Sequence, residues 1–234
     1  MQIPRCYVSE IFHSIQGEGV LQGFETLFVR FQGCHQACKW CDTKHSWKQN
    51  KKYEWKSADL LKEILTSVKG TETWVCLTGG EPMEQFGQVQ WLIEKMHKND
   101  VHNISIETSG LPIPDKKDLT DLLDMGVFFS ISPKMGSALG ARFDAVEFNH
   151  IVRTWGEYVY VPHKMQYKFV VSSEADLKLL ASYCRTWDTP HHLIIQVEAS
   201  MIADKPFIAA CYSFVRQHPH FRLSMQIHKL LCMR

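Results

Sequence analysis

The stretch Cys34-His-Gln-Ala-Cys38-Lys-Trp40-Cys41 guides the interpretation of the whole chain. Three residues separate its first two cysteines, two separate the second pair, and no fourth cysteine follows at similar spacing. Zinc ribbons and ferredoxins normally use four protein ligands, whereas three thiolates on a four-iron cluster leave one iron with an open position. The stretch therefore predicts a 4Fe-4S cluster at which a second molecule can coordinate iron.

A structural zinc site is the alternative for the same cysteines. His35 or His45 could complete a Cys3His site beside the run. Trp40 favours the cluster, because an aromatic residue just before the last cysteine can form an apolar wall for a flat adenine ring. The remaining cysteines lack ligand spacing and are expected to be buried or incidental thiols: Cys6, Cys76, Cys184, Cys211 and Cys232.

Composition and charge limit the class of protein. The 234 residues are 45% hydrophobic, enough for one substantial core, and no compositional shift marks a border, so we expect a single domain over residues 1–234. The net charge of +1 is spread without a basic stripe, so nucleic-acid binding is not expected. Because the sequence has neither a signal-peptide pattern nor an apolar run of roughly 18 residues, we expect a cytoplasmic protein without membrane attachment.

Short apolar runs alternate with amphipathic stretches along the chain. Runs rich in β-branched or aromatic residues predict strands at 26–31, 73–77, 104–107, 127–131, 167–171 and 193–197. Amphipathic stretches predict helices at 57–68 with Ser57 as N-cap, and at 85–97, 173–183 and 206–217. This alternation predicts an α/β fold with a parallel sheet covered by helices on its outer face. About six strands in this length favour a partial, open β/α barrel over a closed eight-fold one.

Polar motifs follow the predicted strands. The cysteine loop comes after the first strand, and the later motifs are Thr78-Gly-Gly80-Glu-Pro82, Glu107-Thr-Ser-Gly110, Ser132-Pro133-Lys134 and Gln196-Val197-Glu198-Ala199. Ligands bind at the C-terminal ends of strands in folds of this kind, so we expect these motifs to face one basin.

Each motif also has a structural alternative. The paired glycines bring the backbone close to a ligand or form an ordinary turn. The segment 107–110 suits a ribose or a strand-ending turn, and Lys134 is either a carboxylate partner or an exposed lysine. Arg30 could be a buried ion-pair partner of Glu10 or Glu107, and His228 could cap the last strand. Other histidines lack partners at metal spacing and receive no role: His191, His192, His218 and His220.

The cysteine pattern and the Gly-Gly-Glu-Pro segment downstream of it resemble the radical S-adenosylmethionine (SAM) superfamily, whose signature is Cys-x3-Cys-x-aromatic-Cys. Further segments narrow the resemblance to the 7-carboxy-7-deazaguanine synthase family, and they span nearly the whole chain: residues 10–19, 28–31, 41–43 and 222–229. The expected fold is therefore the radical SAM core.

This resemblance implies a lyase that converts 6-carboxy-5,6,7,8-tetrahydropterin to 7-carboxy-7-deazaguanine with release of ammonia, a step toward queuosine and other 7-deazapurines. It implies that the reduced cluster splits SAM to a radical that takes a hydrogen from the substrate and later returns it. No catalytic side chain is assigned, because the radical forms on SAM. The resemblance also implies Mg2+, a homodimer and a flavodoxin as electron donor.

The resemblance assigns residues by their positions in matching motifs. The cluster ligands are Cys34, Cys38 and Cys41, and the Mg2+ ligand is Thr43. The substrate-binding residues are Ile15, Gln16, Gly17, Arg30, Thr78 and His228. The SAM-binding residues are Gly80, Ser132, Pro133, Lys134, Gln196, Val197, Glu198 and Ala199.

Two other functions compete with this assignment. An activase of the glycyl-radical type would share the cysteine and glycine motifs, but its protein substrate would not need the loop at 16–18 or the tail at 226–228. A zinc-bound or iron-sulfur binding module without catalysis would have no use for polar motifs at several strand ends. The first alternative differs in substrate, and the second would not turn over SAM.

Overall fold

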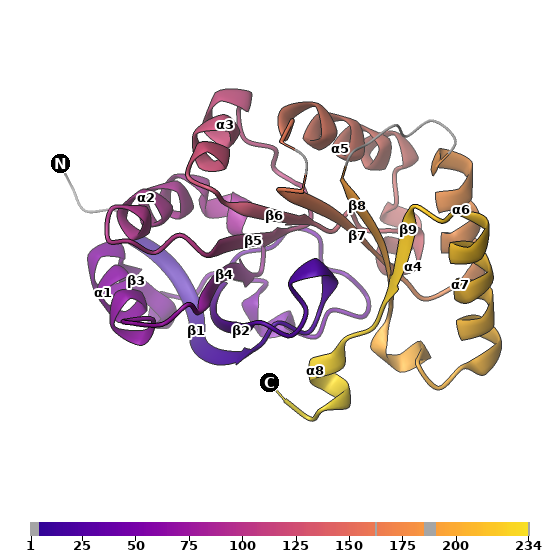
Figure 1. Ribbon diagram of the computed structural model, residues 1–234, viewed down its shortest axis with the longest axis horizontal. Helices are drawn as coiled ribbons and strands as arrows, with labels where there is room; N and C mark the ends of the chain where they lie inside the picture. Colours follow the sequence, from indigo (N-terminus) through magenta and orange to yellow (C-terminus); the bar gives the residue numbers. More distant parts are fainter. Residues whose placement is uncertain (1–4, 162, 185–190, 234) are drawn as a thin grey trace.

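The computed structural model describes residues 5–161, 163–184 and 191–233, without the side chain of Cys184. Within these residues one sheet holds nine strands in the order β3-β1-β2-β4-β5-β6-β7-β8-β9 (Figure 1). Neighbouring strands from β2 to β9 are parallel, whereas β1 pairs antiparallel with both β2 and β3. The strands are β1 (Arg5–Ile15), β2 (Glu25–Phe31), β3 (Glu54–Lys56), β4 (Trp74–Gly79), β5 (Ile104–Thr108), β6 (Phe128–Ile131), β7 (Met165–Val171), β8 (His192–Val197) and β9 (Phe221–Ser224).

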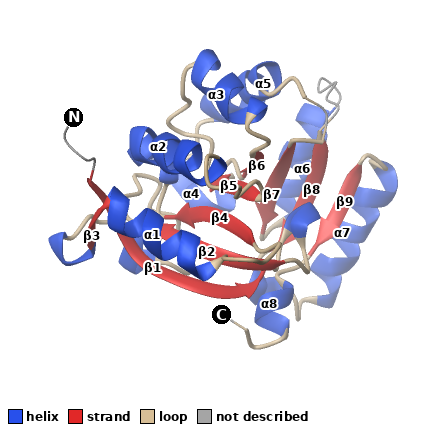
Figure 2. Cartoon of the chain, turned by 60° about the vertical axis from the view of Figure 1, so that its left-hand side comes forward, coloured by secondary structure: helices blue, strands red, loops and turns tan. Residues whose placement is uncertain are grey.

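Helices connect the parallel strands and lie along the outside of the curved sheet (Figure 2). They are α1 (Ser57–Ser67), α2 (Phe86–His97), α3 (Lys116–Asp124), α4 (Gly136–Leu139), α5 (Ala145–Tyr158), α6 (Glu174–Cys184) and α7 (Lys205–Gln217). A short helix, α8 (Ile227–Leu230), follows β9 and lies beside the loop after β1. Side-chain caps fix several starts: Asp144 accepts from Val146 N and Glu147 N before α5, and Asp204 accepts from Phe207 N in α7. No helix in the described part of the chain is long and apolar enough to span a bilayer.

The predicted open α/β architecture is confirmed, and the parallel sheet extends one strand further, to β9. All six predicted strands are present, with β1 and β3 added antiparallel at the other edge. The N-cap prediction at Ser57 is wrong, because β3 runs directly into α1 and Lys56 is the capping position. The buried Ser57 hydroxyl instead donates to Cys6 Sγ at 3.8 Å.

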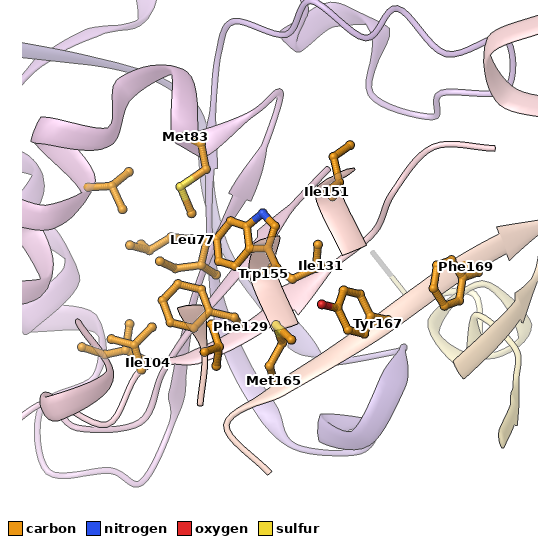
Figure 3. Packing of buried hydrophobic residues seen from close by; sticks show 14 of the residues in the cluster. Leu77, Met83, Ile104, Phe129, Ile131, Ile151, Trp155, Met165, Tyr167 and Phe169 are labelled. Atoms are coloured by element: carbon orange, nitrogen blue, oxygen red, sulfur yellow. The ribbon is translucent and has the colours of Figure 1, made fainter. Parts of the chain in front are cut away.

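The apolar core lies between the sheet and its helices. Met165, Tyr167 and Phe169 alternate along β7 and point to this side, where Trp155 of α5 packs 5.5 Å from Phe129, centroid to centroid (Figure 3). The polar atoms here are satisfied, since the Tyr167 hydroxyl donates to a backbone carbonyl at 2.5 Å and the Trp155 indole to another at 3.0 Å. The intervening strand positions point the other way, which leaves the inner face free for polar side chains.

The cysteines outside the cysteine loop differ in burial. Cys6, Cys76 and Cys211 are buried, and Cys232 is exposed. The side chain of Cys184 lies outside the described residues. None of the described thiols is in a disulfide, as expected of incidental cysteines.

Candidate active site

A cavity of about 230 Å³ lies at the C-terminal ends of the parallel strands. Its wall combines strand ends with the cysteine loop, the loop after β1 and the segment around α8. Residues at or just after strand ends contribute Arg30, Thr78, Glu107, Ser132 and Glu198, and Lys168 reaches the cavity from the middle of β7. The expected convergence of polar motifs on one basin is therefore present in the structure.

The cysteine loop is folded back on itself by hydrogen bonds to the segment that follows it. Cys34 N donates to Trp47 O at 3.1 Å, and the Trp47 indole donates to Cys41 Sγ at 3.3 Å. Ala37 occupies the left-handed region at φ 43°, where a non-glycine residue is unfavourable. The loop needs outside support to keep this conformation.

The chain after β6 supplies that support. The Arg142 guanidinium donates to Gln36 O at 2.8 Å and to Ala37 O at 2.6 Å, bracketing the strained residue. Lys39 N donates to Ala138 O at 3.0 Å, and Cys38 packs with Ala138 in a small apolar cluster beside the main core. The segment 136–143 thus acts as a brace for the cysteine loop.

Trp40 belongs to the same small cluster and lines the cavity, as an adenine-facing wall requires. Its indole Nε1 is buried and has no hydrogen-bond partner among the described residues. A donor in this state is available to a ligand.

All three cysteines of the loop line the cavity. Burial raises the pKa of Cys34 to about 11 and also raises the pKa of Cys38, so bound metal must displace thiol protons. Among the described residues, no three Cys, His, Asp or Glu side chains converge on a single metal position. The His35 ring is bonded to Glu84 and Gln36, each at 2.8 Å, and does not complete a zinc site. Three cysteine thiolates are a ligand set for a four-iron cluster, in which each thiolate binds its own iron.

The paired glycines are required by close backbone contacts. A Cβ on Gly79 would lie 2.4 Å from Phe31 N, and one on Gly80 would lie 2.2 Å from Gly33 O. Gly80 N donates to Phe31 O at 2.9 Å, and Glu81 N donates to Gly33 O at 2.6 Å. This segment therefore sets the position of Gly33, the residue before the first cysteine.

Glu81 links the glycine segment to the end of β5. Its carboxylate is 1% exposed and accepts from Thr108 Oγ1 at 2.5 Å, Ser109 Oγ at 2.6 Å and Ser109 N at 2.7 Å. Burial raises the pKa of Glu81, and the Ser109 and Thr108 hydrogen bonds oppose that rise. The hydroxyls that the sequence suggested for a ribose are thus used to hold this loop.

A charged network forms the floor of the cavity. The Lys168 ammonium pairs with Glu18 and lies 3.6 Å from Glu107, and Gln226 donates to Glu18 at 2.5 Å. Burial alone would raise the pKa of Glu18, but Lys168 and then Gln226 and His228 outweigh it and hold the pKa at about 2. Burial would lower the pKa of Lys168, but Glu107 and Glu18 raise it instead. Glu18 and Lys168 therefore remain charged at neutral pH.

The loop after β1 and the segment around α8 meet at this floor. Ile227 N donates to Gly17 O at 3.1 Å, and a Cβ on Gly17 would lie 1.9 Å from His228 Nδ1. His228 belongs to α8 and packs on the loop after β1, so it does not cap β9. Burial lowers its pKa, with a smaller opposing effect of Glu18.

Arg30 combines the two roles that the sequence left open, ion-pair partner and residue of the cavity wall. Its Nε donates to Glu10 at 2.6 Å, as in the ion-pair alternative, and its guanidinium lies over the Phe12 ring at 5.6 Å. Arg30 nevertheless lines the cavity.

Most of the site residues expected from the sequence line the cavity: Ile15, Gln16, Gly17, Arg30, Cys34, Cys38, Cys41, Thr43, Thr78, Gly80, Ser132, Lys134, Glu198 and His228. Four others do not: Pro133, Gln196, Val197 and Ala199. The Val197 side chain packs in the core on the other face of β8. Gln196 is fully buried, and its amide has no partner within the described structure.

Sequence reasoning named neither Trp47 nor Lys168, and it included four other polar residues of the cavity in motifs without assigning them as site residues: Glu18, Glu107, Gln226 and Lys229. Glu107 and Lys168 lie on the inner face of their strands, between apolar residues that face the core. A charged residue inside an otherwise apolar strand was the available signal, and it is strongest at Lys168.

Comparison with known proteins relates the chain to iron-sulfur proteins. A family model described as a 4Fe-4S single cluster domain matches residues 15–132. A 7-carboxy-7-deazaguanine synthase of Pyrobaculum aerophilum is 33% identical over 189 residues, which cover 80% of this chain and 76% of that protein. The protein of the same name from Prochlorococcus marinus is 27% identical over 237 residues, covering 96% of both chains. That from Thermoplasma acidophilum is 43% identical over 106 residues, covering 44% of this chain and 46% of the relative.

A solved structure described as QueE from Escherichia coli shares the fold, with a TM-score of 0.66 at 23% identity. The likeness covers 95% of this chain and 94% of that chain.

Proposed function

The chain belongs to the 7-carboxy-7-deazaguanine synthase family, and we propose that it converts 6-carboxy-5,6,7,8-tetrahydropterin to 7-carboxy-7-deazaguanine with release of ammonia. It is a radical SAM enzyme with a 4Fe-4S cluster. The observation that carries the proposal is the meeting of the cysteine loop, the glycine segment, the loop after β1 and the segment around α8 at one cavity. A small bicyclic substrate and a nucleoside-like cosubstrate need such a shared, partly buried pocket.

The residues of the cavity suit the two cofactors. Cys34, Cys38 and Cys41 would hold the cluster, in the cavity that the glycine segment also lines. Gly80 has no side chain to keep a ligand from its backbone, and Trp40 offers an apolar wall with a free indole donor. Cluster and SAM together supply a radical that abstracts hydrogen. The chain's own part is to bind, orient and shield the reactants.

The remaining SAM-binding residues would contact SAM either with side chains on the cavity wall or with backbone groups. Ser132, Lys134 and Glu198 would contact SAM with their side chains, since all three line the cavity. Val197, whose side chain is in the core, would contribute backbone groups, together with the other residues of 196–199 and with Pro133.

Arg30 and the loop at 15–17 would orient the pterin. Glu10 takes the Nε–H of Arg30, and the terminal N–H groups would bind the substrate carboxylate in two parallel hydrogen bonds. The backbone of Ile15, Gln16 and Gly17 would lie along the ring, with Thr78 and His228 at its edges. Support comes from the position of all these residues on the cavity wall.

Mg2+ would bind at Thr43, between the cysteine loop and the substrate carboxylate. The Thr43 hydroxyl lines the cavity and lies 3.6 Å from Cys41 Sγ. A hard cation accepts a neutral hydroxyl when carboxylate and water oxygens complete its octahedron. The ion would then hold the carboxylate still during the rearrangement.

We propose one domain over residues 1–234, a homodimer in the cytoplasm and reduction by a flavodoxin. One continuous sheet supports the single domain. Exposed apolar side chains collect in the C-terminal segment and support a dimer contact: Leu223, Met225, Leu230, Leu231 and Met233.

An anaerobic assay tests the reaction. The reconstituted protein is mixed with dithionite, SAM, Mg2+ and 6-carboxytetrahydropterin, and products are followed by mass spectrometry with Cys38→Ala as the control. We expect 7-carboxy-7-deazaguanine from the wild type only. If 5'-deoxyadenosine forms without the deazapurine, the substrate is wrong and an activase gains support; if neither forms with an intact cluster, a binding module does.

A further inference from the structure

A lysine ammonium is buried beneath the cavity. Lys168 lies in the middle of β7, its side chain is 6% exposed, and it points to the inner face of the sheet. Lysine is rarely buried unless a carboxylate pairs with it, and here two do: Glu18 in direct contact and Glu107 at 3.6 Å. None of the roles proposed above uses this cluster of charges.

The cluster has one more negative than positive charge. Three other cations line the cavity: Arg30 is paired with Glu10 at 2.6 Å, Lys229 is paired with Asp42 at 3.0 Å, and Lys134 donates to Ser132 Oγ at 3.2 Å near the cysteine loop. His228 is held neutral at pH 7 by its burial. The excess negative charge must therefore be met by hydrogen-bond donors.

Glu107 carries that excess. Glu18 takes the close contact with Lys168 and a further hydrogen bond from Gln226, whereas Glu107 is farther from the ammonium. Within the described part of the chain, the hydrogen bonds to Glu107 come from neutral donors, Thr78 Oγ1 at 2.9 Å and Gln16 Nε2 at 3.2 Å. A carboxylate has about four acceptor positions, so Glu107 retains capacity for a ligand.

We propose that Lys168 is a positioning residue that selects for the amino-pyrimidinone edge of a pterin, by compensating Glu18 and leaving Glu107 as the acceptor. The inference rests on the proposed function. The 2-amino group and the adjacent ring N–H of a pterin form a pair of donors that fits one carboxylate. The substrate's own carboxylate would lie at the opposite end, near Arg30. Lys168 also fixes the loop at 16–18, and through Gln226 the tail, around the same edge.

Ligand binding to the reconstituted full-length protein tests this role. The probes are 6-carboxypterin and 6-carboxylumazine, which has an oxo group in place of the 2-amino group. The wild type should prefer the pterin by at least about 100-fold, because a site built for N–H donors rejects an analogue that lacks one. Lys168→Met should weaken pterin binding by about 30-fold or more and reduce the preference, since it leaves two carboxylates uncompensated.

Two variants separate charge compensation from packing. Lys168→Met/Glu18→Gln restores the original charge and should recover at least about 10-fold of the lost affinity, because the two side chains are in contact. Lys164→Met serves as the matched control, since Lys164 precedes the same strand and donates to Gly126 O at 3.2 Å outside the cavity. It should bind both probes as the wild type does. Iron content and thermal unfolding are measured for every variant.

The outcomes distinguish this inference from the proposed function. Wild-type affinity and preference in Lys168→Met would overturn the inference and leave the proposed reaction intact. A double variant as weak as the single one would also overturn it, since Lys168 would then act by packing. A wild type that binds no 6-carboxypterin would overturn the proposed substrate and this inference with it.

Discussion

Gly80→Ala should displace the first cysteine without changing any ligand. The added Cβ would lie 2.2 Å from Gly33 O and 2.9 Å from Ser46 O, below the 3.0 Å that Cβ atoms need. Both neighbours are backbone, so a segment must move by roughly 1 Å, and overpacking of this kind costs about 1–3 kcal/mol. Because Gly33 precedes Cys34, the movement should also lower the iron bound per chain.

Gly87→Ala is the matched control. Gly87 lies in α2, and a Cβ there would meet nothing within 4 Å. This change should stabilise the chain by about 0.5–1 kcal/mol, the ordinary gain of alanine over glycine in a helix. Urea unfolding of the metal-free chains and iron analysis after anaerobic reconstitution measure both effects. Wild-type stability together with wild-type iron content in Gly80→Ala would refute the reasoning.

Arg142→Met should speed the loss of iron to a chelator, because it removes two hydrogen bonds from the cysteine loop. Arg216→Met on α7 is the control, and equal rates of iron loss in the two variants would contradict this prediction. Trp155→Ala should lower the free energy of unfolding by about 3–5 kcal/mol in urea titrations, since it empties a fully buried site; a loss under about 1 kcal/mol would argue against close packing there. Glu18→Gln should flatten the pH dependence of stability in acid. Because the pKa of Glu18 is lower in the folded than in the unfolded chain, its contribution to stability is complete above the unfolded pKa of 4.5 and is lost as the pH falls to about 2. If the melting temperatures of wild type and variant change with pH in parallel, the pairing of Glu18 with Lys168 is disproved.

The parallel architecture was predictable because most of its strands are short apolar runs with local signals. β9 gave no such signal, since only the first and last of its four residues are buried. β1 escaped prediction because polar and apolar residues are mixed along its eleven positions. Its inward residue Phe12 faces the cavity and so does not join the core that strand prediction detects.

The cysteine and glycine motifs of the site were predictable for the same reason, because their spacing is local. Lys168 and Arg142 were not, since their roles depend on partners 150 and 106 residues away in the chain. Glu81 shows a different limit of prediction from sequence. Its place in the glycine motif was evident, but only the fold shows that it is bound by Ser109 and Thr108.

The hydrogen bond between Gln226 and Glu18 joins positions 208 residues apart. During synthesis, the cavity floor therefore cannot form until nearly all of this sequence has left the ribosome, although the cysteine loop emerges early. A nascent chain would expose its three thiols long before it could enclose a ligand. Cluster insertion and pocket closure are consequently separable events in the life of the protein, and α8, which follows β9, completes the second of them.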